Sequence, residues 1–352
     1  MSEAKSKPTA FSADRSRQMA GGALKAAWWG AASLALRGVA KPAHAAPGDF
    51  SPSAPPAPEG FVRRAWLEAF EKDAADVAAG LYPPMTPAPI NPATALKQIA
   101  DLMADTRDVE ARRRRGGGTE ARQDAPPGAA FPVYYRQNFH FQTGGWFTDD
   151  SARRYEGQVE ALFAGTAGAM RRRALSLLAA AWRGRDQRSL TIVDLACGAG
   201  AFLANLKTAF PRAGLIGLDL SPAYLAQARR TSGVAALINA NAERLPVADH
   251  SLDAVTCIYL FHELPPRVRP LIAAEIARVL KPGGLLAFAD SVQPADEDRL
   301  ARLLEVFPAY FHEPFYKSYC ETDLTALFGA AGLRVVAQDR AFLTKAMLFE
   351  QV

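Results

Sequence analysis

The second half of the chain alternates short apolar runs with longer amphipathic stretches. The apolar run 191–195 is followed by a helical pattern over 201–210. Strand and helix patterns alternate in the same way along the chain, which ends in two expected strands at 335–339 and 344–351. Buried strands that alternate with crossover helices are typical of a parallel sheet with helices on both faces. We therefore predict an α/β domain over residues 190–352, built on a Rossmann-like, seven-stranded, mostly parallel sheet.

The first half of the chain follows a helical period instead. Phe61, Trp66, Phe70 and Val77 are spaced to lie on one face of a helix. Patterns of this kind predict helices over residues 61–81, 93–110, 149–163 and 167–182. We therefore expect a mostly helical N-terminal extension to the α/β domain.

Composition divides this extension into three parts. Residues 1–60 are basic and end in a stretch rich in Pro and Ala, which predicts a disordered tail followed by a linker. Residues 61–130 are expected to form a helical extension with a flexible loop, in which the arginine run 112–115 is solvated. Residues 131–189 are expected to form a helical cap on the α/β domain.

Charge is concentrated at the beginning of the chain. The net charge is +5, and the residues before Pro47 carry all of it. A basic arm on a neutral body does not favour a nucleic-acid partner. Trp28 and Trp29 in this arm are candidates for a weak contact with a membrane surface. The apolar stretch 19–36 with its basic flank also resembles a transit peptide, which would direct the protein to a plastid or mitochondrion.

The cysteines and histidines argue against a metal or disulfide framework. The three cysteines, Cys197, Cys257 and Cys320, are widely spaced and odd in number, so we expect a reducing, cytoplasmic environment. Cys197 and Cys257 lie in apolar runs and are expected to be buried. The five histidines lack paired ligand spacing, so no metal site is predicted.

The segment after the first predicted strand of the α/β domain indicates a nucleotide-like ligand. Asp194 begins the run that ends in Gly198-Ala199-Gly200 and opens a helix. Small residues allow the backbone to approach a ligand, and the helix N-terminus offers free N–H groups. Asp219 ends the next strand at the spacing where a carboxylate meets ribose hydroxyls.

The same segment disfavours a dinucleotide. The third glycine of the G-x-G-x-x-G fingerprint is missing, because Ala201, Phe202 and Leu203 follow Gly200. Asp194 would repel a pyrophosphate, whereas its carboxylate suits the ammonium group of a methionine moiety. An NAD-type oxidoreductase therefore remains only an alternative.

With these features, residues 190–352 resemble the class I methyltransferases that use S-adenosyl-L-methionine. Residues 194–200 resemble their first motif, Asp219 their ribose-binding acid and residues 241–246 their adenine-flanking segment. Residues 243–246 and 261–265 are most similar to the ubiquinone and menaquinone type of this family.

The resemblance implies a cofactor site and one cap residue beside it. The residues implied to bind S-adenosyl-L-methionine are Asp194, Ala196, Gly198, Gly200, Asp219, Leu220, Asn241, Ala242, Glu243 and Tyr259, together with Tyr155 of the cap. Two of them depart from the family pattern: Ala196 replaces a glycine, and Asn241 replaces an aspartate. Asn241 can still accept a hydrogen bond through its carbonyl oxygen, so we expect weaker binding of the same cofactor.

The acceptor side is predicted from residues just past the fourth strand and from aromatic segments. His262 and Glu263 are candidates to remove a proton from a small-molecule acceptor. Aromatic residues of the cap and of residues 307–320 favour an apolar or aromatic acceptor of quinol, phenol or lipid character. The other candidate side chains in these two segments are Tyr134, Tyr135, His140, Gln142, Trp146, His312 and Tyr319.

Two alternatives of other kinds remain at this point. A catalytically silent protein could bind S-adenosyl-L-methionine and act as a scaffold through its long extension. A nucleic-acid methyltransferase is disfavoured by the neutral body and by the lack of an Asn-Pro-Pro-Tyr-type motif after the fourth strand.

Overall fold

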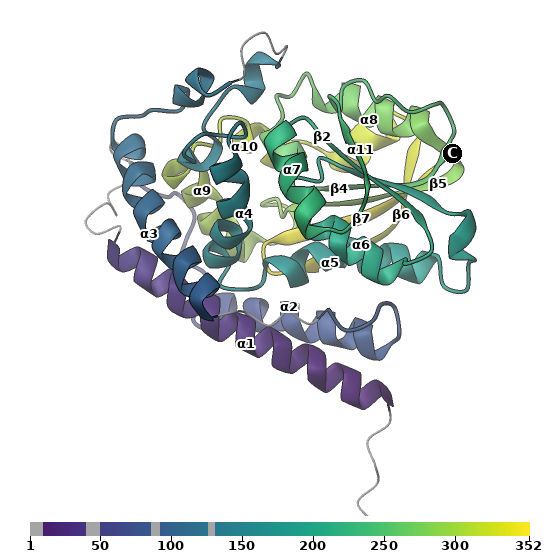
Figure 1. The fold of residues 1–352 in the computed structure, drawn as a ribbon, viewed down its shortest axis with the longest axis horizontal. Helices are drawn as coiled ribbons and strands as arrows, with labels where there is room; N and C mark the ends of the chain where they lie inside the picture. The colour runs from purple at the N-terminus through teal and green to yellow at the C-terminus, as the bar shows by residue number, and fades with distance from the viewer. Residues whose placement is uncertain (1–9, 40–49, 86–91, 126–130) are drawn as a thin grey trace, which may run out of the picture.

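The α/β domain is built on one seven-stranded sheet. The computed structural model describes residues 10–39, 50–85, 92–125 and 131–352 (Figure 1). The strands are β1 (Thr191–Leu195), β2 (Gly214–Asp219), β3 (Ala236–Asn239), β4 (Leu252–Ile258), β5 (Leu280–Ser291), β6 (Leu333–Ala341) and β7 (Thr344–Gln351). Their order is β3-β2-β1-β4-β5-β7-β6. All neighbouring pairs are parallel except the two that involve β7, which runs antiparallel to both β5 and β6. The predicted Rossmann-like fold is confirmed.

Helices cover both faces of this sheet. The helices of the domain are α6 (Ala201–Ala209), α7 (Pro222–Thr231), α8 (Arg269–Val279), α9 (Ala301–Tyr310), α10 (Tyr316–Cys320) and α11 (Leu324–Gly329). Val193 packs with Ile276 of α8 and Phe328 of α11, whereas its neighbour Ile192 packs with Leu206 of α6. Successive residues of a strand point to opposite faces, so this alternation buries both sides of β1.

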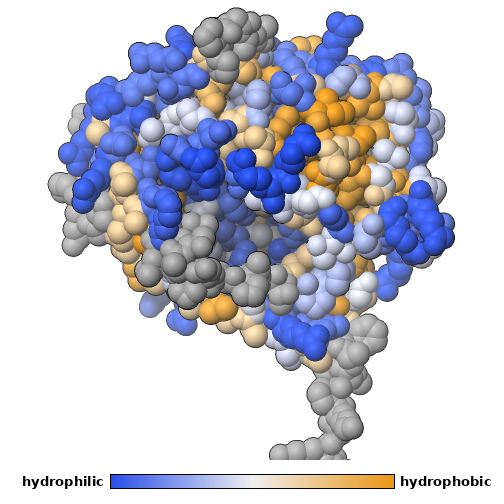
Figure 2. Space-filling view, viewed as in Figure 1, coloured by the Kyte–Doolittle hydropathy of each residue, from blue (hydrophilic) through white to orange (hydrophobic). Residues whose placement is uncertain are grey.

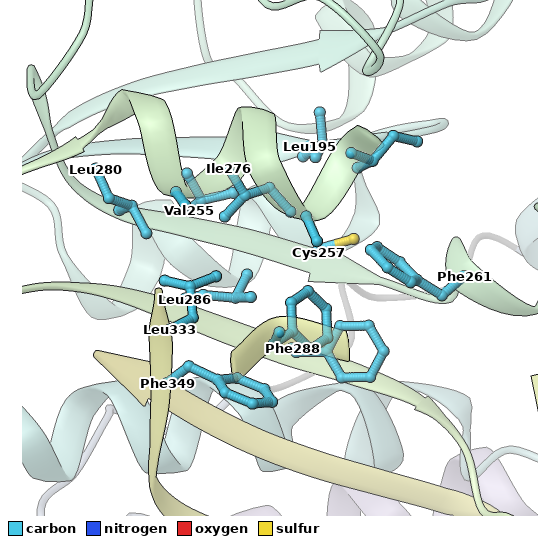
Figure 3. Close-up of a cluster of buried hydrophobic side chains, with 14 of the residues drawn as sticks. Leu195, Val255, Cys257, Phe261, Ile276, Leu280, Leu286, Phe288, Leu333 and Phe349 are labelled. Carbon is cyan, nitrogen blue, oxygen red and sulfur yellow. The ribbon is translucent and has the colours of Figure 1, made fainter. Parts of the chain in front are cut away.

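The core on the α8 and α11 face is drawn in Figure 3, where Cys257 lies among Val255, Phe261 and Phe288. Both Cys197 and Cys257 are buried, as predicted. On the outer surface, Figure 2 shows mostly hydrophilic side chains on the viewed face, with one apolar area where α8 and α11 lie in Figure 1. The apolar side chains that build the sheet are therefore enclosed between two helical layers.

Among the described residues, five α-helices precede the sheet. They are α1 (Ala10–Val39), α2 (Phe61–Ala78), α3 (Pro92–Arg114), α4 (Asp149–Leu162) and α5 (Ala167–Ala181). Figure 1 shows α1 and α2 lying alongside one another beneath the rest of the molecule. α5 packs on the sheet through Ala174, Leu175 and Leu178, so it connects the extension to the α/β core.

The disordered tail predicted for residues 1–60 differs from the structure, because residues 10–39 form α1. Residues 1–9 and 40–49 lie outside the described part of the chain. Within α1, Trp29 and Ala32 pack against Leu102 of α3 and Ala161 of α4. Trp29 therefore faces the protein interior, which removes it from the predicted membrane contact. Alanine has the highest helix propensity, and neighbouring helices supply the burial that the weak amphipathicity of α1 does not reveal.

Polar contacts add to this docking of α1. Gln18 is buried and bonds to Asp73 of α2, while the Nζ of Lys25 lies 2.7 Å from a carboxylate oxygen of Glu160. Gly22 lies so close to α2 that an added Cβ would be 2.8 Å from the Phe70 ring. The basic residue that interrupts the apolar pattern of α1 is thus paired inside the protein.

The solvated loop predicted for residues 112–115 is wrong in part: α3 continues to Arg114 and buries Arg112 and Arg113, while the side chains of Arg114 and Arg115 are exposed. Arg112 is buried, and it donates to Glu120 and to the carbonyl of Phe141. Arg113 and Arg114 donate to Glu110. Arg112 therefore joins α3 to the cap. A search of the described residues found no helix both long and apolar enough to cross a bilayer.

Candidate active site

A cleft lies at the carboxyl ends of β1, β2 and β4, beneath the cap. In an open parallel sheet this edge is where ligands bind. The implied cofactor residues that line the cleft are Asp194, Ala196, Gly198, Asp219, Leu220, Asn241, Ala242, Tyr259 and Tyr155. Gly200 and Glu243, from the same set, do not line it, whereas Glu263 does. The topology thus brings most of the predicted residues to one place.

The turn from β1 into α6 has an unusual backbone. Ala196, Gly198 and Gly200 all have positive φ, at 56°, 53° and 86°. At Gly200 an added Cβ would lie 2.9 Å from the backbone of Ala228, so no other residue fits there. Gly200 acts by shaping the turn, because the residues on either side of it, Ala199 and Ala201, line the cleft.

Asp194 is the most deeply buried acid of the cleft. Its Oδ1 accepts a hydrogen bond of 2.6 Å from the hydroxyl of Thr256, while its Oδ2 is buried without a partner. Burial and the nearby Asp219 raise the pKa of Asp194 to about 7, against the opposing effects of Thr256 and Arg171. An unpaired carboxylate oxygen in a cleft fits a cationic group such as an ammonium.

Asp219 is held differently at the end of β2. Its Oδ2 accepts from the N–H of Gly198 and its Oδ1 from the N–H of Ser221, both at 2.8 Å. Burial raises the pKa of Asp219 to about 6, although these N–H groups oppose the shift. The two bonds fix the carboxylate beside the β1–α6 turn.

Asn241 and Glu243 form a small network at the next edge of the cleft. Asn241 Oδ1 accepts from the N–H of Glu243 at 3.0 Å, and Glu243 Oε1 accepts from the hydroxyl of Tyr134 at 2.7 Å. Glu243 therefore ties the cap to the β3 side of the domain. The carbonyl oxygen of Asn241, which we expected to be available to a ligand, already has one partner.

The cap places several aromatic rings against the cleft. Tyr134, Tyr135, Trp146 and Tyr155 line it, as does Phe139. Trp146, Tyr155 and Tyr224 contact one another edge to face, with ring centroids 5.3–5.5 Å apart. These contacts give the cleft a stiff aromatic wall.

Two other cap candidates do not line the cleft. Gln142 is buried and donates to the hydroxyl of Tyr224 at 2.7 Å, so it supports the aromatic wall from behind. His140 lies next to Glu263 and Glu313 instead.

Residues 307–320 pack behind the cleft. Phe307 and Phe311 lie against the His140 ring, with centroids 6.1 and 6.2 Å away. Tyr319 is fully buried and donates to the carbonyl of Ser291, and the Nε2 of His312 lies 2.8 Å from the Gln137 side chain. None of these four residues lines the cleft itself.

One ion pair of the cleft was not predicted. Arg171 of α5 lies 2.7 and 2.8 Å from the two carboxylate oxygens of Glu156 in α4, and both residues line the cleft. Arg171 is the first of three consecutive arginines, and Arg172 and Arg173 pair with Asp73 and Asp76 of α2. Only the concentration of arginines on a mostly buried helix could have indicated that they have internal partners.

The two predicted catalytic residues occupy the short helix η5 (Phe261–Glu263) just past β4. His262 Nδ1 lies 2.6 Å from Asp290 Oδ1, at the end of β5, and its Nε2 lies 3.9 Å from Glu263 Oε1. His140 of the cap helix η3 (Phe139–Phe141) approaches the same Glu263 oxygen, with Nε2 at 3.7 Å. Asp290 was not predicted; its signal in the sequence is a charged residue directly after the apolar run 285–289 of β5.

Buried acids surround these two histidines. Burial disfavours the charged form of His262, but Asp290 outweighs it and raises the pKa of His262 to about 9. Glu313 and Glu263 in the same way raise the pKa of His140 to about 10 despite burial. The pKa of Glu263 is raised by burial, although the histidines oppose the shift. Across the described residues, no three His, Cys, Asp or Glu side chains have the arrangement of a metal site.

Comparison with known proteins gives one match to a family model and many to curated sequences. The family model described as a methyltransferase domain matches residues 192–284. An uncharacterised methyltransferase of Synechocystis sp. is 32% identical over 145 residues, which span 41% of this chain and 67% of that one. A demethylmenaquinone methyltransferase of Beutenbergia cavernae is 32% identical over 191 residues, which span 54% of this chain and 70% of that one.

Solved structures resemble this chain more distantly. The crystal structure of magnesium protoporphyrin IX methyltransferase from Synechocystis, with bound SAH, has a TM-score of 0.40 and 15% sequence identity. It covers 53% of this chain and 84% of that one.

Proposed function

Because the chain belongs to the class I S-adenosylmethionine-dependent methyltransferases, we propose that its cleft methylates a small, apolar or aromatic acceptor of quinol, phenol or lipid character. The chain is a methyltransferase, and S-adenosylmethionine is its cofactor. The observation that carries the acceptor class is the aromatic wall of Trp146, Tyr155 and Tyr224, which lines the same cleft as the ionisable Glu263. The name of the relative from Beutenbergia cavernae, a demethylmenaquinone methyltransferase, supports a quinone-like acceptor.

The residues of the cleft fit this cofactor. The unpaired Oδ2 of Asp194 suits the ammonium group of the methionine moiety, and Asp219 suits the ribose hydroxyls. Arg171 is the cation of the cleft that would receive the methionine carboxylate. Asn241 and Ala242 would flank the adenine, and Tyr155 would cover the cofactor from the cap. When bound, the sulfonium supplies an electrophilic methyl group and a thioether leaving group.

The protein's own contribution is alignment, exclusion of water and proton removal. An in-line displacement needs its reacting atoms held in contact, which the stiff wall of Trp146, Tyr155 and Tyr224 provides. The same wall keeps water from the cleft and strengthens the charges inside it. Glu263 lines the cleft with His262 beside it, and in this proposal it accepts the proton of the acceptor.

A transfer assay tests this proposal directly. The protein is incubated with S-adenosylmethionine carrying a deuterated methyl group and with a panel of reduced quinones and lipid-like phenols. We expect S-adenosylhomocysteine to form together with a labelled acceptor, as read by mass spectrometry. Cofactor binding without label on any member of the panel would contradict the proposed acceptor class and favour the silent scaffold.

A further inference from the structure

Two histidines lie beside Glu263, the acid that lines the cleft, and each has a buried carboxylate close to its Nδ1. The Nδ1 of His262 is hydrogen-bonded to Asp290 Oδ1 at 2.6 Å, whereas the Nδ1 of His140 forms an ion pair with Glu313 Oε1 at 2.7 Å that lacks hydrogen-bond geometry. The side chains of both acids have no solvent exposure. A carboxylate on one ring nitrogen places a proton there and leaves the other nitrogen, Nε2, to face outward.

Both outward nitrogens approach one carboxylate. His140 Nε2 and His262 Nε2 lie 3.7 and 3.9 Å from the same oxygen, Oε1 of Glu263. These distances are too long for a direct hydrogen bond. Neither histidine therefore uses its Nε2–H on Glu263, and both remain able to donate to a ligand atom next to it.

These four side chains come from three distant parts of the chain. His140 belongs to the cap, His262 and Glu263 follow β4, and Glu313 lies in the segment between α9 and α10. Phe307, Phe311 and Trp146 surround the His140 ring, and Tyr259, Tyr316 and Tyr319 surround the His262 ring. Aromatic surroundings exclude water, so charges at this point act strongly on one another.

The facing charges keep both imidazoles protonated at neutral pH. The charged groups that act on His140 are Glu313 and Glu263; the pKa of the neighbouring His312 is lowered by burial, to which His140 adds. Those that act on His262 are Asp290, Glu313 and Glu263. Two cations therefore flank an acid whose own pKa is raised by burial. This set suits a ligand oxygen that loses a proton and becomes negative.

We propose that His140 and His262 together bind the ionised hydroxyl oxygen of the acceptor while Glu263 takes its proton, which makes the acceptor an acidic enol or phenol. This assignment rests on the proposed methyl transfer. A carboxylic acid acceptor is disfavoured, because it is already ionised, needs no base and is repelled by Glu263.

The step balances with the groups present. The acceptor's O–H bond breaks, its proton goes to the Glu263 carboxylate, and the electron pair stays on the acceptor oxygen between the two imidazoliums. The oxygen, or a carbon conjugated with it, then bonds to the methyl carbon as the carbon–sulfur bond breaks. That electron pair goes to sulfur, and Glu263 returns its proton to solvent.

The test uses 4-nitrophenol as a probe, because its phenolate and phenol forms absorb at different wavelengths. The probe is titrated into the full-length protein saturated with S-adenosylhomocysteine, at a pH where it is largely protonated in water. We expect it to bind as the phenolate, and we expect 4-nitroanisole, which has no acidic proton, to bind at least tenfold more weakly. His140→Gln and His262→Gln should each weaken phenolate binding about tenfold or more.

Controls separate this proposal from the proposed function. His250→Gln changes a histidine at the amino end of β4, the opposite edge of the sheet, and should bind the probe like the wild type. Binding to the wild-type protein should lower the pKa of the probe, and binding to Glu313→Gln should lower it less. A variant that only disturbs the structure would leave the pKa of the bound probe as it is in the wild type. Three outcomes would overturn the two-histidine site while S-adenosylhomocysteine still binds. The probe could fail to bind, it could bind as the neutral phenol, or its binding could be unaffected by His140→Gln. Failure of S-adenosylhomocysteine itself to bind would instead contradict the proposed function.

Discussion

The cofactor side and the acceptor side of the cleft are built in different ways. On the cofactor side, Asp194 and Asp219 end neighbouring strands β1 and β2, and backbone N–H groups of the intervening turn hold Asp219. On the acceptor side, His140, Glu263, Asp290 and Glu313 come from four separate segments and meet only through the fold. The first side depends on local chain geometry, whereas the second depends on the docking of the cap and of residues 307–320.

This difference predicts separable failures. Changes on the acceptor side should slow turnover and leave cofactor affinity intact, while changes on the cofactor side should lower affinity before they affect the chemical step.

The largest effect is expected from Glu263→Gln. Removal of the proton acceptor should lower kcat by about 100- to 10,000-fold, the range typical of general-base catalysis. The dissociation constant for S-adenosylhomocysteine, measured by calorimetry, should change less than threefold. A matched loss of cofactor affinity would show that the two sides are not separable.

A smaller effect is expected from Asp194→Asn, and it should depend on pH. The pKa of Asp194 is raised to about 7, so the free carboxyl must lose a proton before it can pair with a cation. Wild-type affinity for S-adenosylmethionine should therefore rise about tenfold from pH 6 to pH 8, which corresponds to about one pKa unit of linkage. The Asn variant should bind about tenfold more weakly at pH 8 and show little of this pH dependence.

Calorimetry in buffers of different ionisation enthalpy provides the independent check. Proton release on binding at pH 6.5 is expected for the wild type and should disappear in Asp194→Asn. Equal pH dependence in the two proteins would assign the titration to another group, Asp219 being the nearest.

The smallest effect is expected from Thr256→Val, which keeps the shape of the side chain and removes the hydroxyl that donates to Asp194 Oδ1. Loss of one hydrogen bond to a charged group should weaken cofactor binding about three- to tenfold at pH 7. The midpoint of the pH dependence should move upward, because the ionised form of Asp194 loses its donor. An unchanged midpoint would mean that this hydroxyl does not control the titration of Asp194.

The cofactor side could be predicted from the sequence because its signal is local. An apolar strand, a small-residue turn and an acid at the end of the next strand lie within residues 191–219. Parallel neighbours necessarily place such strand ends together, so nine of the eleven implied cofactor residues line the cleft. Gly200, in the turn after β1, and Glu243, just past β3, do not line the cleft and support it from outside.

The acceptor side could be predicted only in part. His262 and Glu263 follow a strand and were identified, but their partners Asp290 and Glu313 depend on which segments the fold brings to that edge. Helix α1 shows the same limitation, because Trp29 and Lys25 find partners in α3 and α4 that no spacing within α1 reveals. Arg171 is likewise distinguished from Arg172 and Arg173 only by the face of α5 that meets the cleft.

The most direct measurement for the central claim is calorimetric titration of the protein with S-adenosylmethionine, S-adenosylhomocysteine and NADH, for the wild type, Asp219→Ala and the exposed control Asp298→Ala. We expect micromolar binding of the two sulfur ligands to the wild type and the control, and no binding of NADH. Asp219→Ala should lower the affinity for the sulfur ligands at least a hundredfold, because it removes the two charge-assisted hydrogen bonds expected with the ribose hydroxyls. Binding of NADH alone, or sulfur-ligand affinity unchanged by Asp219→Ala, would contradict the account.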